Sequence, residues 1–347
     1  MKEVRALGLL SGGLDSTLAA MVLLNQGIHV EGLYFYTGFC IIESRIQAPR
    51  RHDVDKSFRN EARRAGKDLN IPIHVLRVGE DYLDIVKNPR YGRGSAFNPC
   101  VDCRIYMFRM ARTFMEEHGF DFIFTGEVVA QRPMTQMRHT QALIARQSGI
   151  EDLILRPLSA KLLPPTRPER EGLVDRESLL DIHGRGRSRQ IALAREYNIT
   201  DYPTPSGGCC YLTDPNLKSR FSALFQAKSR DAITLEDLQL VKFGRHFLLP
   251  GGSRLIVGRE EVENIFLKDF SKTRILLDAT EVPGPAALFE GEKDTADFHL
   301  ALDIVARYAN PKTTLRAAIE ITYPSEERET REIAPPDSES VTSYLIV

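Results

Sequence analysis

A glycine-rich hexapeptide near the N-terminus carries the first candidate chemistry. It reads Ser-Gly-Gly-Leu-Asp-Ser and lies between a short apolar run and an Ala/Leu-rich segment. Glycines let a backbone approach a ligand closely, and unpaired N–H groups at a helix start favour an anion. The carboxylate of Asp15 would repel a phosphate, so Mg²⁺ is expected between them. A capped glycine turn is the simpler alternative. The candidate nucleotide-binding residues in this segment are Ser11, Gly12, Gly13, Asp15, Ser16 and Thr17.

Clustered cysteines form the second chemical group. Cys100 and Cys103 make a C-x-x-C at the expected start of a helix, where thiol pKa values fall, and Cys209 and Cys210 follow two glycines far downstream. Three thiolates, two of them from the C-x-x-C, can hold a [4Fe–4S] cluster and leave one iron open. Structural zinc, a catalytic persulfide with a resolving cysteine and plain buried cysteines are the alternatives. An odd total of five cysteines argues against a disulfide scaffold.

Alternating strands and helices are expected to position these residues. The apolar patterns predict strands at 4–10, 30–36, 73–78 and 121–125, and helices at 16–26, 53–69 and 105–118. This alternation is typical of an α/β, doubly wound parallel sheet. Gly126 and Glu127 follow the fourth strand, at the sheet edge where such folds bind ligands. Tyr36, Gly126 and Gln131 complete the nucleotide-binding candidates.

The second half of the chain has a different texture. The pattern of residues 176–198 predicts a pair of helices, and that of residues 217–243 predicts a helical segment. Short strands follow from Gly244, then a helix at 296–308 and a strand at 315–322, as in a small α+β domain. Residues beyond 325 are rich in Glu and Asp and are expected to be mobile. The predicted parts are an ATP-binding catalytic domain (1–160), a helical and loop extension carrying the remote cysteines (161–240), an RNA-binding α+β domain (241–325) and an acidic tail (326–347).

Composition narrows the class of protein. The 347 residues carry a net charge of −1, which does not support an overall electrostatic grip on nucleic acid. Two local basic stretches, 45–67 and 185–195, are candidates for tracking an RNA backbone, or are solvated faces. The longest charge-free apolar stretch is 15 residues, whereas a membrane span needs about 20. With no cleavable signal pattern either, a cytoplasmic protein is expected.

The hexapeptide resembles the signature of the PP-loop ATP pyrophosphatases. That resemblance implies cleavage of ATP between its α- and β-phosphates, adenylation of a substrate oxygen, and displacement of AMP by a nucleophile. Asn-Pro-Cys-Val-Asp-Cys at 98–103, Thr-Gly-Glu at 125–127 and the downstream Gly-Gly-Cys-Cys together resemble the tRNA thiolation branch, which makes 2-thiouridine or 4-thiouridine. Cys103 then matches the first essential cysteine. The extra Cys100 favours the cluster over a persulfide, with Cys209 slightly preferred to Cys210 as the remote ligand.

The C-terminal part has its own resemblance. Val-Gly-Arg-Glu at 257–260 and Val-Pro-Gly-Pro at 282–285 resemble the RNA-binding domain of ribosome-quality-control (NFACT) factors. The resemblances together imply an ATP-dependent tRNA sulfurtransferase that makes 4-thiouridine, using ATP, Mg²⁺ and a [4Fe–4S] cluster. Its partners would be tRNA and an external sulfur donor, sulfide or a cysteine desulfurase, and a homodimer is left open. The rivals are a persulfide-relay 2-thiouridine synthase, a PP-loop nitrogen-transfer synthetase with structural zinc, and a non-catalytic RNA-binding protein.

Overall fold

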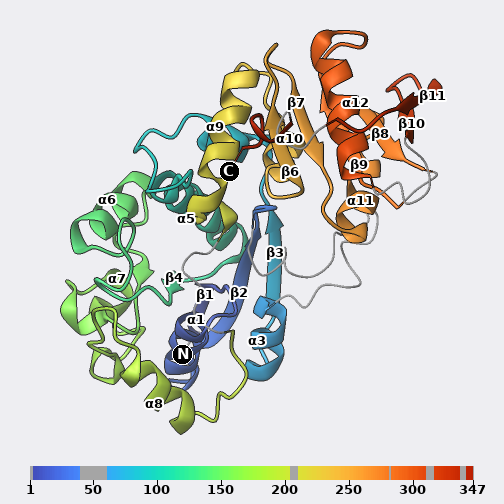
Figure 1. The fold of residues 1–347 in the computed structure, drawn as a ribbon. Coiled ribbons are helices and arrows are strands. Elements are labelled where there is room, and N and C mark those ends of the chain that lie inside the picture. Colours follow the sequence, from blue (N-terminus) through green and yellow to red (C-terminus); the bar gives the residue numbers. More distant parts are fainter. Residues whose placement is uncertain are drawn as a thin grey trace. The chain divides into compact units, whose positions relative to one another are not determined.

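The chain folds into two compact units in a computed structural model (Figure 1). The structure describes residues 3–39, 61–203, 210–280, 283–309, 316–336 and 341–346. Of these, residues 3–39 and 61–203 form the first unit, and the residues from 210 onward form the second. The extension expected at 161–240 is therefore divided between the two units.

A parallel sheet is the centre of the first unit. Its order is β3-β2-β1-β4-β5, and every neighbouring pair is parallel. The strands are β1 (Arg5–Leu9), β2 (His29–Tyr36), β3 (Ile73–Arg77), β4 (Phe122–Thr125) and β5 (Ile154–Leu155). The chain winds outward from β1 in one direction and continues from β4 in the other, so the order reverses between the carboxyl ends of β1 and β4. Ligands bind at such a reversal in open α/β sheets.

Helices cover both faces of this sheet. They are α1 (Leu14–Leu24), α3 (Glu61–Leu69), α4 (Glu80–Lys87), α5 (Cys100–His118), α6 (Arg138–Ser148), α7 (Arg167–Arg170) and α8 (Ser188–Glu196). Alternate residues of β1 enter different cores: Ala6 packs with α1, and Leu7 packs with α5 and α6. This period of two in a doubly covered strand confirms the predicted doubly wound α/β fold.

The helical pair predicted at 176–198 is half wrong. Only α8 is an α-helix, whereas Arg176–Ser178 is a single 3₁₀ turn. Asp175 accepts a hydrogen bond from the backbone N–H of Glu177 and so caps that turn. Leu179 then adopts an extended conformation and is buried in the core beneath α1. The apolar residues that suggested a helix therefore pack into the core from an irregular segment.

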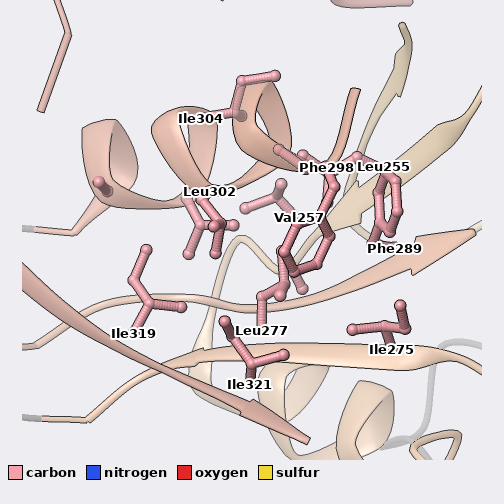
Figure 2. Close-up of a cluster of buried hydrophobic side chains, with 14 of the residues drawn as sticks. Leu255, Val257, Ile275, Leu277, Phe289, Phe298, Leu302, Ile304, Ile319 and Ile321 are labelled. Carbon is pink, nitrogen blue, oxygen red and sulfur yellow. The ribbon is translucent and has the colours of Figure 1, made fainter. Parts of the chain in front are cut away.

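An antiparallel sheet forms the second unit, in the order β11-β10-β8-β9-β7-β6. Its elements are β6 (Arg245–Leu248), β7 (Arg254–Val257), β8 (Ile275–Ala279), β9 (Ala286–Glu290), β10 (Ala317–Thr322), β11 (Arg328–Ile333), α9 (Lys218–Ala227), α10 (Leu235–Leu240), α11 (Glu261–Lys268) and α12 (Ala296–Tyr308). Figure 2 shows Phe298 and Leu302 of α12 packed against strand residues such as Leu277. The predicted helix at 296–308 is confirmed residue for residue.

The expectation of a mobile tail after residue 325 is wrong for the described residues. Residues Arg328–Ile333 form β11, which pairs antiparallel with β10 along its whole length. Farther on, Val341 is 2% exposed and Leu345 bridges to Phe247. Charged residues are typical of an edge strand because they oppose pairing with other chains. The same charges gave this segment the composition of a disordered tail. Residues 337–340 lie outside the described part.

Within the described residues, no helix is long and apolar enough to cross a membrane.

Candidate functional site

The glycine-rich loop joins β1 to α1 at the carboxyl edge of the parallel sheet. Gly12 has φ +74°, and a Cβ there would lie 2.1 Å from the backbone carbonyl carbon of Glu61. Only glycine fits both conditions. Gly13 occupies the N-cap position of α1, so no side chain of that residue covers the N–H groups of the first turn. The loop thus has the geometry of an anion site at a helix N-terminus.

Hydroxyl groups stiffen the loop from within. Ser16 Oγ donates to the Gly13 carbonyl at 2.8 Å, and Thr17 Oγ1 donates to the same oxygen at 3.1 Å. Ser11 Oγ lies 3.4 Å from both Gly13 N and Ser16 Oγ. The predicted hydroxyl residues are therefore assembled in one place. In this arrangement Ser16 and Thr17 hold the turn rather than point out of it.

Asp15 is held at one oxygen and unsatisfied at the other. Its Oδ2 accepts from Gln131 Nε2 at 2.6 Å and lies 3.5 Å from Arg187 Nη2. Fully buried Gln190 in turn donates to Gln131 Oε1 at 2.8 Å. The other oxygen, Oδ1, is buried and has no hydrogen-bond partner in the described structure. A buried carboxylate oxygen without a donor is costly, and a cation would satisfy it, so Asp15 fits the expected Mg²⁺.

Gly126 brings the end of β4 against the loop. A Cβ at this position would lie 2.4 Å from the backbone N of Ser16 and 2.5 Å from the carbonyl carbon of Asp15. The glycine is therefore required for close approach of two backbones, a reason that sequence reasoning did not give. Tyr36 ends β2 at the same sheet edge, and the guanidinium carbon of Arg77 lies 5.6 Å from its ring centre.

The cysteine helix presents its N-terminus to this edge. Because α5 leads directly into the start of β4, it runs opposite to the strands, and its first turn lies at their carboxyl ends. The helix begins at Cys100, five residues before the predicted start, so the C-x-x-C belongs to that turn. Asn98 Nδ2 donates to Cys100 Sγ at 2.9 Å, and Tyr82 OH donates to Cys103 Sγ at 3.2 Å. Tyr82 was not predicted from the sequence, because it lies in no recognisable motif.

The predicted metal-ligand set is described only in part. Cys209 and Cys40 lie outside the described residues. Cys210 is described in the second unit, where its carbonyl accepts a hydrogen bond from Thr213 Oγ1 at 2.6 Å. Residues with a described structure contain no group of three or more His, Cys, Asp or Glu that could hold a metal. Cys100 and Cys103 supply the soft thiolates that iron or zinc prefers, and their further ligand remains a prediction.

Several arginines of the two basic stretches pair with acids where the stretches are described, among them Arg64, Arg187 and Arg189. Arg64 binds Glu61 and Asp68, each at 2.7 Å, and donates to the Gly12 carbonyl at 3.1 Å. In the second stretch, Arg189 pairs with Asp181 at 2.7 Å. Residues 45–60 of the first stretch lie outside the described part. Arg64 therefore holds the backbone of the phosphate loop through the Gly12 carbonyl. The sequence did not predict this contact.

Comparison with known proteins gives two separate matches, one for each of the two units. Residues 4–148 match the family model described as the tRNA methyl transferase HUP domain, and residues 244–345 match the NFACT protein RNA binding domain. The second match confirms the predicted resemblance of the last part to NFACT factors. The first match, together with the 2-thiouridylase relatives given below, confirms the predicted resemblance of the first part to PP-loop enzymes of the tRNA thiolation branch.

The curated relatives compared here match about a third of the chain. The tRNA-specific 2-thiouridylase MnmA of Sulfurimonas denitrificans is 34% identical over 124 residues, which are 35% of this chain and 33% of that protein. The enzyme of the same name from Syntrophotalea carbinolica is 33% identical over 131 residues, 36% of this chain and 35% of that protein. The chain thus spans about a third of the length of these relatives.

One of the similar solved structures is a complex of a 4-thiouridine synthetase with RNA and bound ATP. It is 23% identical, with a TM-score of 0.29, and the match covers 44% of this chain and 36% of that one.

Proposed function

We propose that this chain is an ATP-dependent tRNA uridine thiolase that releases AMP and pyrophosphate, with 4-thiouridine as the expected product. One observation carries the proposal. A loop suited to phosphate, with an unsatisfied oxygen on Asp15, and a helix start bearing Cys100 and Cys103 lie at one edge of one sheet. The sequence similarity of residues 4–148 to the tRNA methyl transferase HUP domain supports it.

The loop residues would hold the triphosphate of ATP. The N–H groups at the start of α1 would face the phosphates, and Asp15 Oδ1 would hold Mg²⁺, which neutralises the pyrophosphate. ATP supplies the adenylyl group that turns the uridine oxygen into a leaving group. Gln131 and Arg187 would keep Asp15 in place because both bind its other oxygen.

Sulfur would reach the activated base from the cysteine helix. The C–O bond of the adenylated uridine breaks, its electron pair leaves with AMP, and a C–S bond forms in its place. Cys103 and Cys100 would hold or deliver the sulfur with Cys209 or Cys210. A [4Fe–4S] cluster on three of these thiolates would supply a Lewis-acidic iron that binds hydrosulfide. In the persulfide form, a cysteine desulfurase would place a sulfane sulfur on one cysteine, and this sulfur would attack the activated carbon. A second cysteine thiolate would then break the remaining S–S bond, release the thiolated base and leave a disulfide between the two cysteines.

The second unit would bind the RNA. Residues 244–345 match an RNA-binding family, so we assign them the role of holding tRNA while the parallel sheet acts on the base. Sulfide would supply the sulfur if a cluster is used, whereas the persulfide form would need the sulfane sulfur of a cysteine desulfurase. The names of the relatives, 2-thiouridylases, favour 2-thiouridine as a second candidate product.

Nucleoside analysis tests this function. The full chain is incubated anaerobically with an unmodified tRNA transcript, MgATP and a sulfur source, either sulfide or a cysteine desulfurase with cysteine, and the digested tRNA is analysed by mass spectrometry. We expect 4-thiouridine, absent with Cys103→Ser and with Asp15→Asn. Finding 2-thiouridine instead would change the product and keep the reaction. A wild-type chain that binds ATP and tRNA but forms no thionucleoside would contradict the proposal.

Metal analysis separates the two forms of sulfur delivery. Anaerobic purification should give about four irons and four sulfides per chain if a cluster is present. Both should be lost in Cys100→Ala, in Cys103→Ala and in one of the two variants Cys209→Ala and Cys210→Ala. Zinc without iron would contradict the cluster and favour a synthetase with a structural zinc site. Absence of bound metal would favour the persulfide.

A further inference from the structure

A buried glutamate joins the cysteine helix to the core of the sheet. Glu127, just after β4, is 4% exposed, and each of its carboxylate oxygens faces a different arginine. Its Oε2 accepts from Arg156 Nε at 3.0 Å, and its Oε1 lies 3.1 Å from Arg104 Nε. Arg156 directly follows β5, whereas Arg104 comes from the first turns of α5. One carboxylate thus links three elements of the first unit.

This link leads from the sulfur atoms to the phosphate loop. Arg104 is adjacent to Cys103 in the chain and lies over the Phe108 ring of the same helix, 5.6 Å from its centre. Glu127 is adjacent to Gly126, which packs directly against the backbone of the loop. The path from thiol to loop is therefore short. Cys103 is bonded to Arg104, Arg104 pairs with Glu127, and Glu127 is bonded to Gly126, which packs against the loop.

The pairing is poorly suited to a purely stabilising role. Arg156 is 7% exposed, and its Nη2 is buried without a hydrogen-bond partner in the described structure. Two arginines therefore share this one carboxylate. Desolvation makes buried ion pairs weak sources of stability, and their best-attested use is to fix one arrangement of elements.

We propose that the Arg104–Glu127 pair is a positioning device that fixes the cysteine end of α5 against the phosphate loop. Arg156 holds Glu127 in the orientation that receives Arg104. The device keeps the Cys103 sulfur at a set distance from the phosphates of bound ATP, so that one substrate can meet both. This role rests on the proposed function, because it concerns where the sulfur stands relative to the nucleotide.

The matched variants come from a single helix. Arg104→Met breaks the link to α5 and leaves the buried Glu127–Arg156 pair intact, so the chain should fold. Arg104→Lys restores the charge. Arg112→Met is the control, because Arg112 pairs with Glu116 on the same helix at 2.8 Å, with both side chains about half exposed. All variants are made in the full-length chain.

Two readouts are used. The first is protection of Cys103 from iodoacetamide by Mg²⁺ and α,β-methylene-ATP, measured by peptide mass spectrometry on the chain freed of bound metal by chelation. The second is the kcat of tRNA thiolation and the KM for ATP. We expect Arg104→Met to abolish most of the protection and to lower kcat about 10- to 100-fold, as misplacement of reacting groups does. Its KM for ATP and melting temperature should stay near wild type. Arg104→Lys should recover part of both losses, and Arg112→Met should change neither readout.

The outcomes separate this inference from the proposed function. Wild-type protection and kcat in Arg104→Met would overturn the inference. So would the absence of nucleotide protection in the wild-type chain, because the sulfur would then not stand beside the nucleotide. A wild-type chain that shows protection but forms no thionucleoside would instead contradict the proposed function, and the protection readout of Arg104→Met would still decide the inference.

Discussion

Gly126→Ala should damage the nucleotide site from outside the loop. The added Cβ would meet the backbone of Asp15 and Ser16 at 2.4–2.5 Å, and a backbone cannot swing aside as a flexible side chain can. Overpacking of this kind costs about 1–3 kcal/mol. For a unit of this size, 1 kcal/mol shifts the melting temperature by about 2–4 °C. We therefore expect a decrease of about 2–12 °C for the first unit.

Nucleotide affinity is the more specific readout of the same change. If the strain is relieved by moving the first turn of α1, the N–H groups and Asp15 leave their positions. A loss of about 1.4 kcal/mol in binding then raises the Kd about tenfold. Calorimetric titration with MgATP measures this. Gly186→Ala is the control, because nothing lies within 4 Å of a Cβ there and its φ is not positive. Wild-type affinity and melting temperature in Gly126→Ala would refute the close approach of β4 to the loop.

Three further predictions follow from buried charges. Asp15→Asn should weaken binding of MgATP at least about tenfold but leave binding of ATP in EDTA little changed. Titration in the two buffers measures both affinities, and equal losses in both would count against a cation at Asp15. Burial alone would raise the pKa of Glu31, but hydrogen bonds from His74, His29 and Arg5 outweigh it and lower the pKa from 4.5 to about 2. Glu31 therefore contributes about 3 kcal/mol of stability above pH 4.5, lost as the pH falls towards 2; in acid titrations of the free energy of unfolding, Glu31→Gln should remove this part of the slope. Arg274 binds Asp237 and Glu290, each at 2.6 Å, in the second unit. Arg274→Met should lower the free energy of unfolding, measured in urea, by about 3–5 kcal/mol. A loss below about 1 kcal/mol would show that Arg254 and Lys228 are enough to balance the two carboxylates.

The sequence predicted the elements that have a strong local pattern. Apolar runs before Ser-Gly-Gly and after Phe120 gave β1 and β4 because buried parallel strands are continuously hydrophobic. The helix at 296–308 has an apolar stripe on the face it buries, and Thr295 accepts a hydrogen bond at its N-terminus. By contrast, β5 has only two residues and no pattern of its own, and β11 has the charges of a solvated tail.

The candidate site was predicted by motif and completed by packing. Loop residues and thiols could be named because each lies in a short motif with a chemical reason. Gln190, Tyr82 and Arg156 could not, because they come from distant segments and touch the site only after folding. Their residue types are ordinary for a helix or a loop. A single sequence carries no local signal that would pair Gln190 with Gln131, 59 positions away.

The stoichiometry of one reaction tests the central claim most directly. The full chain, tRNA transcript, MgATP and sulfide are mixed anaerobically, and AMP, ADP and thiouridine are quantified in the same sample. We predict AMP and thiouridine in a ratio near one, with little ADP, and neither product above background in Asp15→Asn. Formation of ADP in place of AMP, or thiouridine formed without ATP, would contradict an adenylating thiolase built on this loop.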